Sequence, residues 1–434
     1  MKEFVSNWGN YPVLSAEMTE PPFESDIVEF VKSKQSAIAR GMGRSYGDAS
    51  LHHTIISTKK LNAILDFNEE EGLIKCQAGI SLEKILAFIV PKGFFLYVTP
   101  GTKYVSIGGA IAADVHGKNH HLEGSFSNYV LEFRMIDSDG VVHRCSKNRN
   151  EQLFWDTFGA MGRTGIILDA TIRLRRIQTS YIFQEKIKVR NLREMVEMLE
   201  KSKEFTYNVA WLDMLKKGNS LGRGVLIRGE HARKNQLHQR ARSKPLIWGK
   251  TGNVNIPFHF PDFLLSRLAV NMFNSFVYLK QIREKTTSLV HLDTFFYPLD
   301  RISNWNSFYG KNGFIQYHLV CPMETGDTCI KKVAELVSSF GYGSFLTVLK
   351  ILGKSQEKAK YSFAQEGYTM AMDVKMSKQT PELVSQLDEI IYEFGGKVYL
   401  AKDAMSSKKV AGELYQKKNK FMSHQAERLL LHVR

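Results

Sequence analysis

Three glycine-rich segments in the first 167 residues constrain this chain more than any other feature. They are GMGRSYGDASL at 41–51, TPGTKYVSIGGAIAADVHGKNHH at 99–121 and GAMGRTGII at 159–167. Glycine has no β-carbon, so a loop rich in it brings backbone N–H groups close to a phosphate or a flat ring. One such loop is weak evidence, because most are simple turns, but three in one region indicate a more specific site.

The first segment does not have the glycine pattern of a nicotinamide-binding Rossmann fold. Gly41, Gly43 and Gly47 are spaced GxGxxxG, whereas the Rossmann fingerprint is GxGxxG. No clear helix follows the segment either. The sequence therefore disfavours a Rossmann domain.

The composition is that of an ordinary globular protein. The chain has 434 residues, of which 43% are hydrophobic and 24% charged, and this length corresponds to two or three domains. These values exclude a disordered, collagen-like or disulfide-scaffold protein. The four cysteines form neither a CxxC pair nor a Cys/His zinc pattern, so we expect a reduced, intracellular chain. The N-terminus lacks the apolar core of a signal peptide, and no apolar stretch approaches 18 residues, so we expect no membrane-spanning helix.

The order of hydrophobic patterns divides the chain near residue 180. Before that point, short strands and helices alternate with glycine turns. Residues 81–93 are typical of an amphipathic helix, and 130–145 of a hairpin around Asp139-Gly140. After it, the order strand, helix, strand occurs three times, which predicts one sheet covered by helices on one side. A basic helix ends the chain, and the fold class is α+β.

The formal net charge of +15 suits nucleic acid, a phosphorylated substrate or an anionic membrane surface. Basic residues concentrate in a segment at 216–250, which we call the basic segment. It holds one acid, Glu230, and ten cations: Lys216, Lys217, Arg223, Arg228, Arg233, Lys234, Arg240, Arg242, Lys244 and Lys250. An apolar, aromatic run at 256–279 follows. One interpretation is a solvated loop before a buried helix; the other is a surface that rests on an anionic membrane. Nucleic-acid binding is less favoured, because no nucleic-acid module surrounds the segment.

Several separated motifs together resemble a known family. RGMGRSYGD after a strand, the PGT…GGAIAADVHGKNHH block and a GxTGI-like strand resemble the flavin domain of the vanillyl-alcohol oxidase and p-cresol methylhydroxylase (PCMH) superfamily of FAD-linked oxidases. The HGKNHH block and YLAKD at 399–403 most resemble the decaprenylphosphoryl-ribose 2′-oxidases. The resemblance runs from about Trp8 to Asp403. It implies a two-domain α+β fold, in which a PCMH-type flavin domain at 1–180 is completed by 396–434 and a substrate domain at 181–395 includes the basic segment.

The resemblance also implies which residues bind FAD. They are Ala39, Arg40, Gly41, Met42, Gly43, Arg44, Ser45, Tyr46, Gly47, Asp48, Ala49, Gly101, Ser106, Ile107, Gly108, Gly109, Ala113, Asp114, Val115, His116, Ile167 and Tyr399. In covalent members of the superfamily a histidine of the first loop bonds to the flavin. Arg44 takes that place here, so we expect non-covalent FAD.

Flavin-dependent oxidation of an alcohol needs a base or a cation near the hydroxyl. Lys402 lies in the apolar strand VYLAKD, where burial can lower a lysine pKa enough for it to act as a base. The pattern alone also fits an edge-strand lysine facing water, but Lys402 matches the family's catalytic lysine. The resemblance further implies His116 as a catalytic residue near the ring. The substrate-binding residues that it implies are Lys118, Gln316, His318, Lys350 and Lys402, with Tyr46 bordering them.

The histidines of the second glycine segment raise the question of a metal. His116, His120 and His121 lie near Asp114, but HxxxHH in a glycine loop is no recognised ligand spacing. We therefore expect no metal site.

Two positions depart from the family pattern. Ala371 takes the place of a pocket cysteine that covalent inhibitors modify in the best-known members, so we expect resistance to such reagents. The stretch between Tyr415 and Phe421 holds only QKKNK, where family members have a longer helical stretch. Because of this shorter stretch, neither the identity of the substrate nor the packing of the last helix need follow the family pattern.

The function implied is FAD-dependent oxidation of the 2′-hydroxyl of a polyprenyl-phosphate-linked pentofuranose to its 2′-keto form, the first half of a 2′-epimerisation. An NAD(P)H-dependent keto-reductase would act on the product, which in the best-known systems supplies cell-wall arabinan. We expect a cytoplasmic protein held on the inner membrane face by the basic segment. Two alternatives remain: an FAD-dependent oxidase of a soluble aldonolactone or alditol, and a non-enzymatic basic nucleic-acid-binding protein.

Overall fold

The computed structural model describes residues 2–34, 36–249, 254–261, 266–341, 344–417 and 419–430. Lys250 of the basic segment, residues 262–265 of the apolar run and the last four residues of the expected terminal helix lie outside these ranges. Within them, no helix is both long enough and apolar enough to cross a membrane.

Two sheets and the helices α1 to α5 form the described part of the first domain before residue 180. The smaller sheet contains, in spatial order, β1 (Lys2–Ser6), β2 (Val13–Thr19), β4 (Thr54–Ser57) and β3 (Ile38–Arg40). The larger, antiparallel sheet contains β5 (Ile64–Asn68), β6 (Leu73–Gln77), β10 (Ile166–Arg176), β8 (Val130–Ile136) and β9 (Val142–Ser146), with β7 (Phe94–Leu96) paired to β10. The helices are α1 (Glu24–Ser33), α2 (Leu82–Ile89), α3 (Ile107–Ala112), α4 (His120–Glu123) and α5 (Glu151–Thr157).

Local sequence signals explain several of these elements. The hydroxyl of Ser81 accepts a hydrogen bond from the Lys84 N–H and so caps α2. That helix buries Leu82, Ile85, Leu86 and Ile89, the apolar face that the sequence predicts. The expected hairpin is also present, because β8 and β9 pair antiparallel on either side of Gly140.

An eight-stranded antiparallel sheet forms the second domain. Its spatial order is β15 (Lys285–His291), β11 (Tyr181–Val189), β13 (Gly224–His231), β12 (Tyr207–Leu212), β18 (Thr347–Leu352), β19 (Gly367–Lys375), β17 (Phe314–Pro322) and β20 (Lys397–Val398). The three expected strand–helix–strand units are β11–α6–β12, β17–α10–β18 and β19–α11–β20, through α6 (Leu192–Glu200), α10 (Met323–Phe340) and α11 (Thr380–Glu393).

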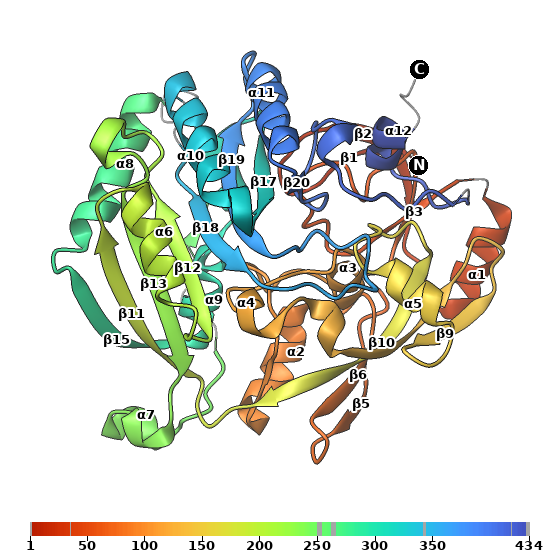
Figure 1. Cartoon of the computed structure of the whole chain (residues 1–434). Helices are drawn as coiled ribbons and strands as arrows, with labels where there is room; N and C mark the ends of the chain where they lie inside the picture. Colours follow the sequence, from red (N-terminus) through yellow and green to blue (C-terminus); the bar gives the residue numbers. More distant parts are fainter. Residues whose placement is uncertain are drawn as a thin grey trace.

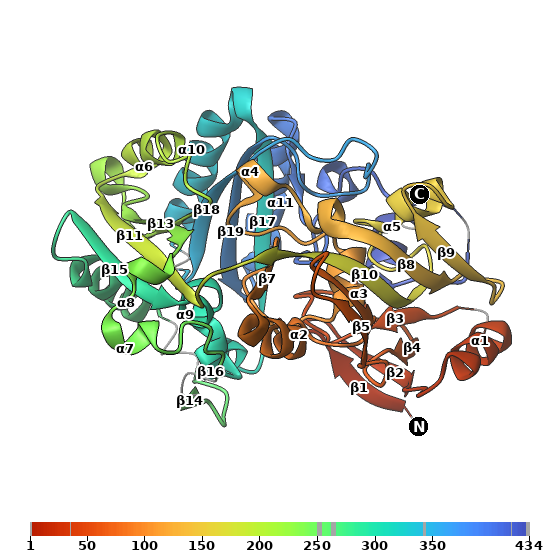
Figure 2. The ribbon, with the colours of Figure 1, turned by 90° about the horizontal axis from the view of Figure 1, so that it is seen from below.

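One apolar core joins these three helices to the sheet. It includes Met195 of α6, Val333 of α10 and Leu387 of α11, packed against sheet residues such as Leu319 and Met370. Figure 1 shows α6, α10 and α11 on the same face of the sheet, and Figure 2 shows the sheet and the first domain side by side. The predicted sheet with helices on one side is therefore present.

The chain returns to the first domain later than the sequence predicts. Strand β20 pairs with β17, so residues 397–398 still belong to the eight-stranded sheet. After them the chain crosses back and ends in α12 (His424–Leu430), which buries Gln425, Ala426 and Leu429. The short stretch before α12 is anchored to the first domain, because the Asn419 amide donates to the Arg163 carbonyl (2.6 Å).

The cysteines differ from the expectation. The structure joins Cys321 of β17 to Cys329 of α10 in a disulfide, so the expectation of a fully reduced chain is wrong for this pair. Cys76 and Cys145 are free and buried.

The basic segment is not one surface. Its middle is β13, where Arg228 forms an ion pair with Glu185 (2.7 Å). A strand of eight residues spans roughly 26 Å, so β13 separates the cations at its start from those at its end. Figure 1 shows the result: α8 (Arg267–Lys280), which Lys216 and Arg223 contact, and α7 (Gln239–Arg242) lie at opposite ends of the domain. The described residues also form α9 (Leu292–Phe296), β14 (Val254–Asn255) and β16 (Ile302–Ser303).

Candidate active site

A cavity of about 340 Å³ lies between the two domains. One wall is formed by the three glycine-rich segments of the first domain, and the other by side chains of β17, β18 and β19 and by the segment after β20. All five predicted substrate-binding residues line it, as does Ala371.

Most of the predicted cofactor-binding residues also line this cavity. They are Ala39, Gly41, Met42, Gly43, Arg44, Ser45, Tyr46, Ala49, Gly101, Ser106, Gly108, Gly109, Ala113, Val115, His116, Ile167 and Tyr399. The first two glycine segments meet here, because a β-carbon at Gly41 would lie 2.0 Å from the Ser106 hydroxyl oxygen. Only glycine therefore fits at position 41, where the first loop packs against the Ser106 side chain of the second.

Five predicted cofactor-binding residues, Arg40, Gly47, Asp48, Ile107 and Asp114, are not among the residues that line the cavity. The Arg40 guanidinium donates to the Ser6 carbonyl (2.7 Å) and to the Asn7 side chain, and so supports the first loop from behind. Asp114 is buried and accepts a hydrogen bond from the Ser362 hydroxyl (2.6 Å). These two side chains hold the wall in place, and the prediction of direct cofactor contact does not describe their contacts here.

The first glycine loop packs directly against the segment that carries Lys402. The Tyr46 N–H donates to the Ala401 carbonyl (3.1 Å). A β-carbon at Gly47 would lie 1.9 Å from the Asp403 carbonyl oxygen, so this close approach requires glycine. The position of Lys402 is therefore coupled to the position of the loop.

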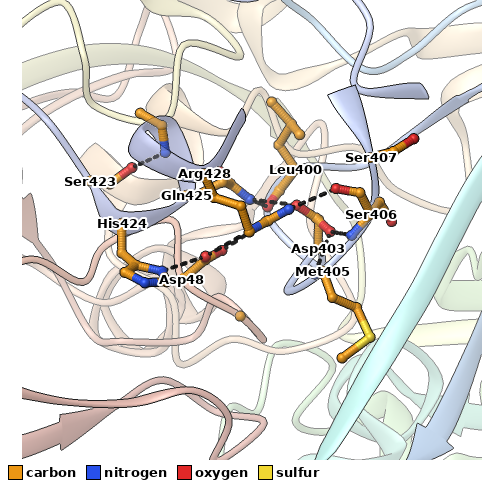
Figure 3. A network of polar contacts seen from close by, with 12 residues as sticks. Asp48, Leu400, Asp403, Met405, Ser406, Ser407, Ser423, His424, Gln425 and Arg428 are labelled. Atoms are coloured by element: carbon orange, nitrogen blue, oxygen red, sulfur yellow. Dashed lines mark hydrogen bonds and ion pairs between the residues drawn. The ribbon is translucent and has the colours of Figure 1, made fainter. Parts of the chain in front are cut away.

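A buried polar network fastens the same two segments to α12 (Figure 3). Arg428 donates to Asp48 of the first loop (3.1 Å) and to Asp403 (2.6 Å), and His424 contacts Asp48 (2.9 Å). Burial alone would lower the pKa of Arg428. The charges of Asp403 and Asp48 outweigh this effect and raise the pKa. The C-terminal helix thus supports both walls of the site.

Three lysines enclosed by the cavity have lowered pKa values. Exclusion of water by the surrounding protein lowers the pKa of Lys402 to about 7, of Lys118 to about 7 and of Lys350 to about 8. Asp373 opposes this effect at Lys402, and Lys350 adds to it. Within the part of the chain that the structure describes, neither Lys350 nor Lys402 forms an ion pair, and the Lys402 ammonium lies 3.6 Å from the centre of the Tyr46 ring. Lys402 and Lys118, with pKa values of about 7, can therefore hold or release a proton near neutral pH.

Two neutral histidines face the same space. Burial, together with the charge of Lys350, lowers the pKa values of His116 and His318 well below the ordinary value. The Thr369 hydroxyl donates to the Leu319 carbonyl (2.7 Å), so it can only accept from His318 Nε2 (3.0 Å). His318 Nδ1 is then left as an acceptor, and among the described residues it has no hydrogen-bond partner; neither has His116 Nδ1.

The buried carboxylate of Asp373 holds Gln316, one of the residues that line the cavity. Asp373 of β19 accepts hydrogen bonds from Gln316 Nε2 (2.6 Å) and the Tyr309 hydroxyl (2.9 Å). Burial raises the pKa of Asp373 to about 6. Asp373 is not among the residues predicted from the sequence. An acid within the apolar strand YTMAMDV is the signal that could have identified it, because a buried carboxylate needs hydrogen-bond partners.

Other residues of the wall also lack a sequence pattern. Trp8 lies under the Arg44 guanidinium, whose carbon is 3.9 Å from the ring centre. Trp305 packs against Trp8, with ring centres 5.6 Å apart. The Asp300 carboxylate accepts from the Lys103 N–H (2.8 Å). Each contact joins segments far apart in the chain.

The second glycine segment does not gather a metal site. His120 contacts the Ser125 hydroxyl (3.0 Å), whereas His121 contacts the Phe205 carbonyl (2.9 Å). Among the described residues, no group of three or more His, Cys, Asp or Glu side chains is placed to hold a metal ion.

The residues present fit a flavin cofactor. The glycine-rich wall leaves room for a long, flat ligand, because Gly41 and Gly108 pack so closely that a β-carbon would lie 2.0 Å from the Ser106 hydroxyl oxygen and 3.0 Å from the Ala78 β-carbon. Arg44 carries no nucleophile that could bond to the ring. Non-covalent binding therefore remains our prediction.

Comparison with known proteins agrees with this arrangement. Residues 24–146 match the family model of the FAD binding domain. The chain is 34% identical over 388 residues to the decaprenylphosphoryl-β-D-ribose oxidase of Mycolicibacterium smegmatis, covering 88% of this chain and 83% of that protein. It is also 26% identical over 255 residues to the D-arabinono-1,4-lactone oxidase of Candida glabrata, covering 56% of this chain and 46% of that protein. With its glycine-lined wall and its lysines facing one cavity, this chain belongs to the decaprenylphosphoryl-β-D-ribose oxidase family of FAD-dependent oxidoreductases.

Proposed function

We propose that this protein oxidises the 2′-hydroxyl of a polyprenyl-phosphate-linked pentofuranose, of the decaprenylphosphoryl-β-D-ribose type, to the 2′-ketone. The observation that carries the proposal is that Lys350 and Lys402, neither of which forms an ion pair among the described residues, line the same cavity as the rings of His116 and His318. A phosphorylated sugar offers both the negative charge and the hydroxyl groups that these side chains can bind.

Oxidation of a secondary alcohol removes the hydroxyl proton and a hydride from the carbon. Bound FAD supplies the hydride acceptor. Lys402 is the residue best suited to take the proton, because its pKa of about 7 leaves a large neutral fraction at physiological pH. The Tyr46 ring holds its amine in place.

The histidines and the other lysines orient the sugar. The rings of His116 and His318 line the cavity, and the contact of His318 Nε2 with the Thr369 hydroxyl (3.0 Å) fixes the orientation of the His318 ring. Lys350 and Lys118 bring positive charge to the phosphate and the ring oxygens. Gln316, held by Asp373, completes the wall.

The lipid-linked substrate implies partners. The 2′-ketone would be reduced by an NAD(P)H-dependent keto-reductase, which completes the 2′-epimerisation and in the best-known systems supplies cell-wall arabinan. A substrate dissolved in a bilayer requires contact with the membrane, and the net charge of +15 supports contact with an anionic cytoplasmic face.

The similarity to D-arabinono-1,4-lactone oxidase favours a second candidate, a soluble aldonolactone. One experiment distinguishes the lipid-linked sugar from the soluble aldonolactone as substrate. The FAD-loaded protein is mixed anaerobically with lipid-linked ribose, free ribose or D-arabinono-1,4-lactone, and the flavin absorbance is followed. We expect bleaching by the lipid-linked sugar alone and its loss in Lys402→Ala. Lys408→Ala, at an exposed lysine of the same segment, is the control. Bleaching by the lactone alone would replace the first proposal with the second.

A further inference from the structure

Helix α8 has an unusual surface pattern, because four of its large apolar side chains face outward while Val270 and the polar Asn274 are buried. Leu268, Met272, Phe276 and Leu279 are 69%, 65%, 65% and 62% exposed. Their spacing of three and four residues places them in one row along the helix. A soluble protein seldom exposes a continuous apolar row unless the row meets a partner.

Polar contacts fix this orientation. The inward face of α8 contains Asn274, which is fully buried and donates to the Asp213 carboxylate (3.2 Å) and the Ser344 carbonyl (3.2 Å). On either side, Lys216 donates to Asn271 (2.9 Å) and Arg223 to Ser275 (3.1 Å). Rotating the helix to bury its apolar row would break these bonds, so the outward row is a stable feature of the fold.

Cations frame the apolar row. Arg267, Lys280 and Arg283 are exposed, and no acid occurs from Ser266 to Arg283. Tyr278 lies between Lys188 and Arg223, each with its charged atom 4.5 Å from the ring centre. Ile282, 86% exposed, extends the apolar surface beyond the helix end. An apolar row edged by lysine, arginine and tyrosine is the composition of a helix that lies in the interface of an anionic bilayer.

The helix is connected to the cavity wall. Phe273 of α8 packs against Phe345, with ring centres 5.1 Å apart. The next residue, Leu346, lines the cavity. Phe345 and Leu346 therefore connect α8 to the cavity wall.

We propose that α8 is the membrane-docking element of this protein, with its apolar row inserted among the lipid headgroups of an anionic bilayer and its cations on the lipid phosphates. The choice of a membrane as occupant rests on the proposed function, since a lipid-linked substrate must be drawn from a bilayer. The far end of the basic segment, around α7, is not part of this surface, because α7 and α8 lie at opposite ends of the domain (Figure 1).

Flotation with vesicles tests the proposal directly. The FAD-loaded protein is mixed with vesicles of phosphatidylcholine alone or with phosphatidylglycerol added, and the bound fraction is measured. We expect binding to the anionic vesicles only. Met272→Asp with Phe276→Asp should lower the partition coefficient at least tenfold, whereas Phe23→Asp, at an equally exposed phenylalanine of the first domain, should not change it.

Two triple variants test the contribution of the cations around α8. Replacing Arg267, Lys280 and Arg283 with glutamine should weaken binding by about fivefold for each cation. The same change at Lys234, Arg240 and Lys244, near α7, should leave binding unchanged. Equal effects of the two triple variants would overturn the proposal, because they would show a general charge effect.

Further outcomes separate this proposal from the proposed function. Binding to anionic vesicles that depends on α8, in a protein that oxidises only the soluble lactone, would support docking and refute the lipid-linked substrate. Turnover of the lipid-linked sugar without vesicle binding would refute docking alone. Self-association that is abolished by Phe276→Asp, without vesicle binding, would show that the row is a protein interface and would also refute docking.

Discussion

Replacement of Lys402 by methionine should change activity and stability in opposite directions. The substitution keeps the length of the side chain and removes the amine that takes the substrate proton. Loss of a positioned base lowers a rate by about 10²–10⁴-fold, so kcat/KM should fall by that factor. In the unchanged protein kcat/KM should rise with pH through about 7, where the lysine loses its proton. The variant should lose this rise.

The effect on stability follows from the same pKa. The value of about 7 in the folded protein lies below the ordinary 10.5, so between these pH values unfolding takes up a proton and the free energy of unfolding rises with pH. Each step of one in pKa corresponds to about 1.4 kcal/mol, so enclosing this amine costs about 5 kcal/mol near pH 7. The contact with the Tyr46 ring, worth about 1–2 kcal/mol, and water admitted by the cavity offset part of it. We expect Lys402→Met to raise the free energy of unfolding at pH 7 by about 2–3 kcal/mol.

Urea unfolding of the FAD-loaded proteins at pH 7 and near pH 10, with stopped-flow flavin reduction, measures both effects. The gain in stability should shrink as the pH approaches 10.5. Lys408→Met, at an exposed lysine, should leave both quantities unchanged. The reasoning would be refuted by a variant that keeps its activity within tenfold, or by one that is less stable than the unchanged protein at pH 7.

Three substitutions and one precipitation assay test other parts of the site. Gly47→Ala should lower the FAD content and the melting temperature, because its β-carbon would meet the Asp403 carbonyl oxygen at 1.9 Å, while Gly249→Ala, with nothing within 4 Å, should do neither. Arg428→Gln should lower the free energy of unfolding by about 3–5 kcal/mol in urea, because two buried carboxylates lose a partner; Arg193→Gln, at a highly exposed arginine, should not. Ala371→Cys should gain one equivalent of a maleimide by mass spectrometry, whereas the unchanged protein should gain none, since burial raises the pKa values of Cys76 and Cys145 to about 12. Acid precipitation should leave the flavin in the supernatant; flavin in the pellet would show a covalent bond and contradict the interpretation of Arg44.

The parts of the fold that the sequence predicts are those set by local patterns. The three strand–helix–strand units, the hairpin at Gly140 and the capped helix α2 each depend on the periodicity of neighbouring residues. The glycine loops were identifiable because their spacing matches a family. Lys402 needed that match as well, and the predicted strand at this position is wrong: β20 ends at Val398, and Lys402 lies in the turn that follows.

The residues that the sequence does not predict depend on contacts between distant segments. Trp8 and Trp305 meet across almost 300 positions, and Asp373 acquires its role from Gln316 and Tyr309. The prediction that the basic segment forms a single surface was wrong for a related reason. Its cations are close in sequence, but the extended strand β13 places the two ends of the segment at opposite ends of the domain.

The site is assembled from segments that no single domain could supply. The glycine wall belongs to the first domain, Lys350 to β18 of the second, and Lys402 to the segment where the chain returns. Arg428 then joins Asp48 of the first glycine loop to Asp403 beside Lys402. Because one guanidinium holds both, a shift of the loop that carries the cofactor wall must also shift the base. The last helix does not line the cavity, but its buried charges hold both segments that do. Loss of Arg428 should therefore weaken FAD binding and proton transfer together.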